Sequence, residues 1–142
     1  MGTSTLIKTE ADCLNQAISA AWNSKDSSAV LPLLSPNAEW IDNETHHRGR
    51  SEIWAALQSQ WVHTLHFQVQ QHLTSVDGHR ITTRYESEWQ DSLHGQWYRR
   101  SGQAAFLFDA DRRITKIESH LEQEPISADA RRLRLGVTAP QS

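Results

Sequence analysis

The feature that most constrains this chain is a change of hydrophobic period near residue 63. Before that point, apolar residues recur at the three- and four-residue spacing of helices, as Leu14, Ile18 and Trp22 do. After it, apolar and polar residues alternate as they do in strands, and Asp77-Gly78 is a hairpin signal between two such runs. Helices followed by a series of strands predict an α+β domain.

The same patterns place the individual elements. Thr9, with Asp12 three residues later, predicts a capping box at the start of the first helix. The predicted helices span about 10–23, 27–34 and 51–63, and the predicted strands span about 38–42, 65–69, 81–89, 96–108 and 114–122. We expect a cone-shaped fold of three N-terminal helices packed on a strongly curved, mainly antiparallel sheet. The mouth of such a cone is a natural pocket.

Length and charge limit the classes of protein to consider. The 142 residues fit one domain, which we place at 1–126, followed by a loose polar tail at 127–142. The net charge is −3, with both signs mixed along the chain, which argues against nucleic acid or a membrane surface as partner. The sequence shows neither an apolar run long enough for a membrane helix nor the apolar segment of a signal peptide, so we expect a cytoplasmic protein.

Three segments resemble the nuclear transport factor 2-like superfamily, also called the SnoaL-like group. They are AAWNSKDSSAVLPLLSPNAEW, RGRSEIWAAL and GQWYRRSGQAAFLFDADRRITKIESH, and the resemblance covers about residues 10–126. The superfamily holds ketosteroid isomerase, scytalone dehydratase, limonene epoxide hydrolase and polyketide cyclases, alongside members with no known chemistry. RGRSEIWAAL, RYESEWQD and GQWYRRSG resemble one small subfamily within it. The resemblance implies the cone fold, but one fold serves unrelated activities and implies no substrate.

The chain departs from that subfamily at three places. Gln103-Ala104-Ala105 stands where the resemblance implies an acidic or amide cluster, and 120–123 reads His-Leu-Glu-Gln in place of a Ser-Ile-Asn-Asp-like stretch. Asp42 stands where an asparagine is expected. These differences indicate a rebuilt pocket.

Asp42 is the first candidate for catalysis. It shares a strand face with Trp40, so it points into an apolar interior if the tryptophan does. Resemblance to ketosteroid isomerase places Asp42 at the general base, but the oxyanion-stabilising positions fall near Ile18 and Ala104, which carry no donor. Steroid-type isomerisation with those groups is therefore not expected. The alternative is that Asp42 ends an exposed strand and caps the turn at Asn43.

Glu88, Arg99 and His120 are further candidates, each with a structural alternative. Glu88 and Arg99 are either an acid and an anion clamp in the pocket or a cross-strand ion pair on an outer or dimer-facing surface. An Asp-Arg-Asp arrangement like that of limonene epoxide hydrolase would have to use Asp42, Glu88 and Arg99 or Arg84. His120 is either a proton shuttle or an exposed strand residue.

Aromatic residues supply the predicted pocket walls. We assign substrate binding to Trp40, Trp61, Tyr98 and Phe106, with Arg99 as a charged contact, although Trp61 also fits a helix face that packs in the core. The eight histidines suggest no metal site, because the adjacent His46 and His47 point to opposite faces of a strand and no third ligand joins His120 and Glu122.

These observations lead to two hypotheses. The first is a cofactor-independent enzyme that transfers protons on a small, largely apolar or aromatic metabolite, as a cyclase, isomerase, dehydratase or epoxide hydrolase. The second is a non-catalytic module for small-molecule binding or dimerisation on the same fold. We also expect a homodimer joined through the outer face of the sheet, since a symmetric pair would bury the same residues on both chains.

Overall fold

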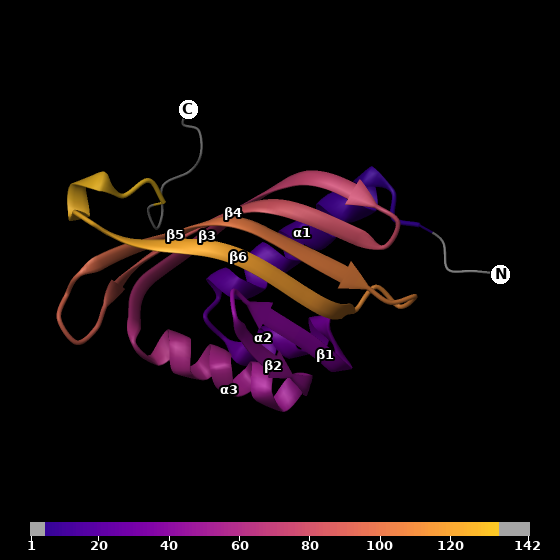
Figure 1. The fold of residues 1–142 in the computed structure, drawn as a ribbon, viewed down its shortest axis with the longest axis horizontal. Coiled ribbons are helices and arrows are strands. Elements are labelled where there is room, and N and C mark those ends of the chain that lie inside the picture. Colours follow the sequence, from indigo (N-terminus) through magenta and orange to yellow (C-terminus); the bar gives the residue numbers. More distant parts are fainter. Residues whose placement is uncertain (1–4, 134–142) are drawn as a thin grey trace.

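Three helices pack against one face of a curved, open sheet, which confirms the predicted α+β class and the cone-like arrangement (Figure 1). The computed structural model describes residues 5–133. The helices are α1 (Lys8–Asn23), α2 (Ser27–Val30) and α3 (Gly49–Val62), and short 3-10 turns lie at η1 (Leu31–Leu33) and η2 (Ala128–Ala130). The strands are β1 (Leu34–Asp42), β2 (Thr45–Arg48), β3 (Thr64–Asp77), β4 (Arg80–Asp91), β5 (Trp97–Phe108) and β6 (Ile114–Ile126).

The sheet runs in the order β2-β1-β6-β5-β4-β3. Neighbouring strands are antiparallel except for β1 and β6, which are parallel and join the first strand of the chain to the last. The sequence did not predict β2, because Thr45-His46-His47-Arg48 contains no apolar residue to alternate. This short polar strand forms one edge of the sheet, where strands of this composition resist pairing with other chains.

The helix starts differ in one respect from the prediction. Ile7 is the N-cap of α1 and offers no side-chain cap, so the capping box at Thr9 and Asp12 is wrong. Asp12 pairs instead with Lys8 one turn earlier, at 3.0 Å. At α2, Asp26 is the N-cap and accepts a hydrogen bond from the backbone N–H of Ser28 at 2.9 Å.

The hydrophobic core lies between the helices and the sheet. Its fully buried members include Ile18, Leu34, Ile53, Leu57, Ile81 and Ile114. Each such side chain contributes about 1.5–3 kcal/mol to folding by leaving water. Asn23 fixes α1 to β3, since its amide donates to the carbonyl of Val69 at 2.9 Å and accepts from the N–H of Val69 at 2.8 Å.

A glycine lets β5 and β6 approach each other. Gly102 has a φ of +154°, and a Cβ at this position would overlap the backbone carbonyl of His120 on β6. Only glycine fits such a close approach of two backbones.

The segment after β6 turns back and contacts the sheet, as its yellow ribbon shows in Figure 1. Arg131 lies over the ring of Trp97, 4.4 Å from its centroid, and the backbone N–H groups of Arg132 and Leu133 donate to Glu88. Through residue 133 the predicted loose tail is therefore held in place, and residues 134–142 lie outside the described residues. Among the described helices, none is long and apolar enough to cross a membrane.

Candidate active site

Strand register sorts the residues of β4 and β5 onto two faces. On the inner face, toward the helices, Ser87 pairs with Arg100 and Trp89 pairs with Tyr98. On the outer face, Glu88 pairs with Arg99. Consecutive residues of a strand point to opposite faces, so neighbours such as Arg99 and Arg100 serve different parts of the molecule.

A cavity of about 260 Å³ opens between α3 and the inner face of the sheet. Its lining residues are Ser59, Gln60, His63, Thr64, Phe67, Tyr85, Ser87, Trp89, Asp91, Arg100 and Gln123. The sheet side of this cavity carries the aromatic rings, and the α3 side is polar. The volume lies just below the ~300–1,000 Å³ of drug-sized ligand sites, which fits a small metabolite.

A recess of about 30 Å³ adjoins the cavity and shares Gln60, Tyr85 and Arg100 with it. Trp40 and Phe106 line this recess, and their role as walls of a substrate pocket stays a prediction. Both rings are also part of the hydrophobic core. The recess therefore extends the cavity toward β1 and β6.

Asp42 and Arg100 form an ion pair at the inner end of the cavity. Nη2 of Arg100 donates to Oδ1 of Asp42 at 2.9 Å, and the Ser119 hydroxyl donates to the same oxygen at 3.1 Å. The two charged side chains are 17% and 19% exposed. Arg100 lines both spaces, whereas Asp42 lines neither and stands behind the guanidinium. The carboxylate that was expected to point into an apolar interior is thus paired with a guanidinium.

Tyr85 places a phenol beside this pair. Removal from bulk water raises the pKa of Tyr85 above its ordinary value of 10.0. The Ser87 hydroxyl and the Arg100 guanidinium act in the opposite sense on this pKa, and Asp42 adds to the increase. Tyr85 is protonated at neutral pH, as an ordinary tyrosine is, so it can donate a hydrogen bond to an oxygen in the cavity.

Ser87 carries a buried hydroxyl in the same wall. The residue is 0% exposed, and its Oγ has no hydrogen-bond partner at bonding geometry among the described residues, although it lies close enough to Tyr85 to lower the pKa of that phenol. The equally buried Thr83, four residues earlier in β4, donates to Oε1 of Gln71 at 2.9 Å. Buried hydroxyls are normally satisfied in this way, which sets Ser87 apart.

Two other predicted wall residues lie at the edge of the site or outside it. Tyr98 stacks on the cavity residue Trp89 with ring centroids 5.8 Å apart. Trp61 is buried on α3 and packs edge-on against Phe67, with centroids 6.3 Å apart. Trp61 lines neither of the two spaces, so its packing matches the alternative of a core residue.

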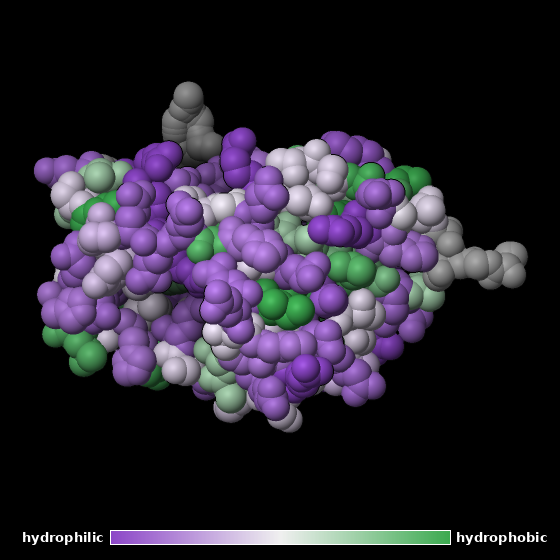
Figure 2. Space-filling model, viewed as in Figure 1, coloured by the Kyte–Doolittle hydropathy of each residue, from purple (hydrophilic) through white to green (hydrophobic). Residues whose placement is uncertain are grey.

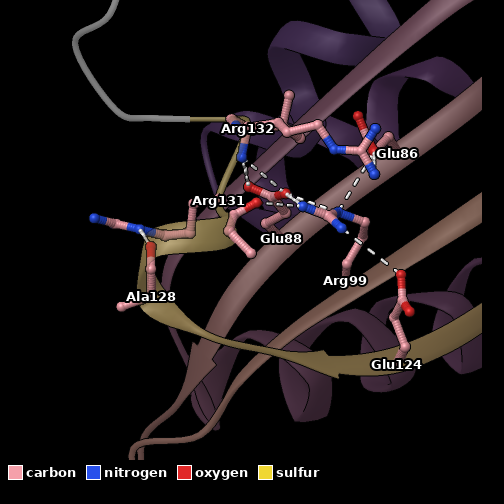
Figure 3. Close-up of polar contacts among 9 residues, drawn as sticks. Glu86, Glu88, Arg99, Glu124, Ala128, Arg131 and Arg132 are labelled. Atoms are coloured by element: carbon pink, nitrogen blue, oxygen red, sulfur yellow. Dashed lines mark hydrogen bonds and ion pairs between the residues drawn. The ribbon is translucent and has the colours of Figure 1, made fainter.

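Glu88 and Arg99 lie on the outer face, away from the cavity, which corrects their assignment as pocket acid and anion clamp (Figure 3). Glu88 is 1% exposed, and its carboxylate accepts from Nε of Arg99 at 2.9 Å and from the N–H of Leu133 at 2.8 Å. Nη2 of Arg99 donates to the carbonyl of Ala130 at 2.6 Å. The pair holds the C-terminal segment on the sheet.

His120 also lies on the outer face, because the alternate residues Ser119 and Leu121 face the recess. It is exposed to solvent, so its assignment as a proton shuttle in the cavity is corrected too. Within residues 5–133, no group of three or more histidine, cysteine or acidic side chains is arranged to hold a metal ion.

Sequence reasoning missed Arg100, Tyr85, Ser87 and Ser119 as site residues. The alternation in β4 did separate Tyr85, Ser87 and Trp89 from the charged residues between them. Two aromatic residues sharing a face with Ser87 were the available signal that this face is the inner one. Arg100 was masked by its neighbour Arg99, which carries the same charge and points the other way.

Solved structures confirm the resemblance to the SnoaL-like, nuclear transport factor 2-like fold. A putative polyketide cyclase from Xanthomonas campestris pv. campestris is 24% identical, with a TM-score of 0.68 over 80% of this chain and 92% of that one. An epoxide hydrolase of M. tuberculosis, described as LEH-like, is 20% identical, with a TM-score of 0.68 over 80% and 84% of the two chains. The epoxide hydrolase/cyclase-like enzyme SalBIII is 14% identical, with the same TM-score over 80% and 93%.

At these identities the structural likeness establishes the fold alone. No curated protein matches the chain in sequence. A family model does match it, over residues 6–134, and this range includes the C-terminal segment that Glu88 holds. Because the match covers most of the sequence, the chain belongs to the family described as "Protein of unknown function (DUF1348)".

Proposed function

We propose that the cavity is the active site of a cofactor-independent enzyme that transfers a proton on a small, largely apolar metabolite. The observation that carries the proposal is the Asp42–Arg100 ion pair at the inner end of the cavity, beside the protonated Tyr85. Two hydrogen-bond donors that line the cavity, with a base directly behind one of them, are the groups that such a reaction requires.

The proposed reaction begins with a carbonyl oxygen of the substrate placed against Arg100 and Tyr85. Asp42 then removes a proton from the adjacent carbon, and the C–H electron pair moves through the carbonyl group to leave a negative charge on its oxygen. Arg100 and Tyr85 stabilise this oxyanion by donating hydrogen bonds to it. Return of the proton from Asp42 to another carbon completes an isomerisation. In a cyclisation, the enolate carbon attacks a second carbonyl carbon, the C=O electron pair of that carbonyl moves to its oxygen, and this oxygen takes the proton from Asp42.

Oδ2 of Asp42 is the atom that takes the proton in this scheme. Oδ1 already accepts from Arg100 and Ser119, whereas Oδ2 accepts no hydrogen bond within residues 5–133. Because Asp42 stands behind Arg100, the proton reaches it through one intervening water molecule, a distance over which general bases still act.

Dehydration and epoxide opening use the same groups and are the other reactions within this class. The names of the structural neighbours, which include polyketide cyclases and epoxide hydrolases, support an enzyme of this general kind. We favour carbonyl chemistry over epoxide opening, since Arg100 pairs with one carboxylate among the described residues and an Asp-Arg-Asp arrangement needs two.

Hydrogen exchange tests the proposal without knowledge of the natural substrate. A panel of small enolisable ketones is incubated with the protein in D₂O, and deuterium uptake at carbon is followed by NMR. We expect the wild type to speed exchange of at least one member, and Asp42→Asn to slow that exchange by about 10²–10⁴-fold. Asp111→Asn, at an exposed carboxylate in the β5–β6 turn, is the matched control. Equal exchange by wild type and Asp42→Asn would rule out this base.

The alternative is a non-catalytic small-molecule-binding module. The double hydrogen bonding of Asp42 Oδ1 favours it, because a carboxylate engaged in this way also serves a purely structural role. The homodimer likewise stays a prediction. Its proposed interface, the outer face of the sheet, is partly occupied by residues 127–133, so a dimer would pair beside this segment or include it.

A further inference from the structure

The Ser87 hydroxyl has no function in the scheme above, and its position is costly. A buried hydroxyl without a hydrogen bond destabilises a protein by the free energy of removing it from water. Ser87 nevertheless lines the cavity and is the register partner of Arg100 across β4 and β5. A bound molecule that accepts a hydrogen bond from the Ser87 hydroxyl would offset this loss of free energy.

The surrounding donors define the part of the ligand that would bind here. Tyr85 lies two residues before Ser87 on the same inner face, and Arg100 lies opposite, so three hydrogen-bond donors occupy adjoining places on two strands. One oxygen atom that accepts several hydrogen bonds fits between them. Because Asp42 already neutralises Arg100, this position favours an oxygen that is neutral before reaction over a permanently ionised acid.

The rest of the cavity defines the body of the ligand. Phe67 and Trp89 give the sheet side an aromatic surface, while Gln60 and His63 of the α3 side are polar. A planar conjugated molecule can lie with one face on the two rings. Its oxygen then points along the sheet toward Ser87 and Arg100.

We propose that Ser87 is a substrate-binding residue and that the substrate is a planar, conjugated molecule with one phenol-like or enolisable carbonyl oxygen, which Ser87, Tyr85 and Arg100 bind together. This inference rests on the proposed function, since it names the substrate class of the same cavity. It excludes simple carboxylic acids and molecules that lack such an oxygen.

Three probes of nearly equal shape test the inference by binding alone. They are 4-nitrophenol, nitrobenzene, which lacks the hydroxyl, and 4-nitrobenzoate, which carries a permanent carboxylate. Titrations of the intact chain are followed by calorimetry, and the visible absorption of the ionised phenol reports its protonation state. We expect 4-nitrophenol to bind at least about tenfold more tightly than either of the others.

Ser87→Ala should weaken binding of 4-nitrophenol about tenfold and leave nitrobenzene unchanged. It should not lower the melting temperature, because the lost hydroxyl has no partner at bonding geometry among the described residues. Ser101→Ala, the same substitution on the outer face next to Arg100, should change neither affinity. This control separates loss of the inner-face hydroxyl from a general disturbance of the sheet.

Three outcomes would overturn the inference: no binding of any probe at millimolar concentration, equal affinity for 4-nitrophenol and nitrobenzene, or unchanged affinity in Ser87→Ala. None of them depends on proton transfer by Asp42. The failure of this inference is therefore distinguishable from the failure of the proposed function, which the exchange rates of Asp42→Asn decide.

Discussion

Replacing Glu88 by glutamine tests the assignment of the Glu88–Arg99 pair to the outer face. The change keeps the shape of the side chain and removes its charge, which leaves Arg99 buried beside a neutral amide. Loss of one partner of a buried ion pair typically costs about 3–5 kcal/mol. Glu86 and Glu124 lie 3.5 and 3.7 Å from the guanidinium and replace part of the lost attraction. We therefore expect a loss of about 3 kcal/mol in the free energy of unfolding.

Urea denaturation measures the loss in the free energy of unfolding. In thermal melts, a chain of this size should show the same loss as a fall of about 6–12 °C in melting temperature. Trypsin cleavage after Arg131 or Arg132 provides a second reading, since the variant carboxamide holds the C-terminal segment less firmly than a carboxylate does. The double variant Glu88→Gln/Arg99→Met should lose less than the sum of the single changes, because it leaves no unpaired charge. Glu122→Gln, at an exposed residue on the same face, is the control.

The refuting result is specific. If Glu88→Gln keeps its stability and its resistance to trypsin but loses binding of 4-nitrophenol or exchange activity, Glu88 belongs to the site. The division of β4 into an inner and an outer face would then be wrong. A fall in stability with unchanged binding at a temperature where the variant is folded supports the structural role.

Two further predictions concern single residues of the sheet. Because burial raises the pKa of Tyr85, the folded protein keeps a proton that the unfolded chain releases above about pH 10. The stability associated with this proton is therefore fully present below that pH, and it falls as the pH rises toward and through the pKa of Tyr85 in the folded state. In thermal melts between about pH 9 and 11, Tyr85→Phe should therefore lose less stability than wild type. Tyr98→Phe is the control. A loss in Tyr85→Phe equal to the losses in wild type and in this control would contradict this account. Gly102→Ala should cost at least about 2–3 kcal/mol or prevent folding, because its Cβ meets the backbone of His120, whereas Gly78→Ala, with open space around it, should cost only about 1 kcal/mol from its left-handed φ; equal melting temperatures for the two variants would contradict the close approach of β5 and β6.

Much of the fold follows from local patterns. The helical spacing before residue 63 and the alternation after it place α1, α3, β4, β5 and β6 to within a few residues, and they place the start of β3, which continues beyond the predicted end at 69 to Asp77. The turn at Asp77-Gly78 lies between β3 and β4 as predicted. These features depend on interactions within a few residues of each other, which the sequence displays directly. β2 escaped prediction because its pairing with β1, and no apolar pattern of its own, makes it a strand.

The site depends on contacts that local patterns do not contain. Alternation shows that Ser87 and Glu88 lie on opposite faces of β4. Both residues are buried, and the sequence offers no sign of which segment of the chain covers each face. Ser87 is covered on the side of the helices, whereas Glu88 is covered by Arg132 and Leu133, 44 and 45 residues later in the chain. Only the tertiary structure brings these segments together, so it alone decided that Arg100 lines the cavity and reaches Asp42 on the inner face while Arg99 holds the C-terminal segment on the outer face.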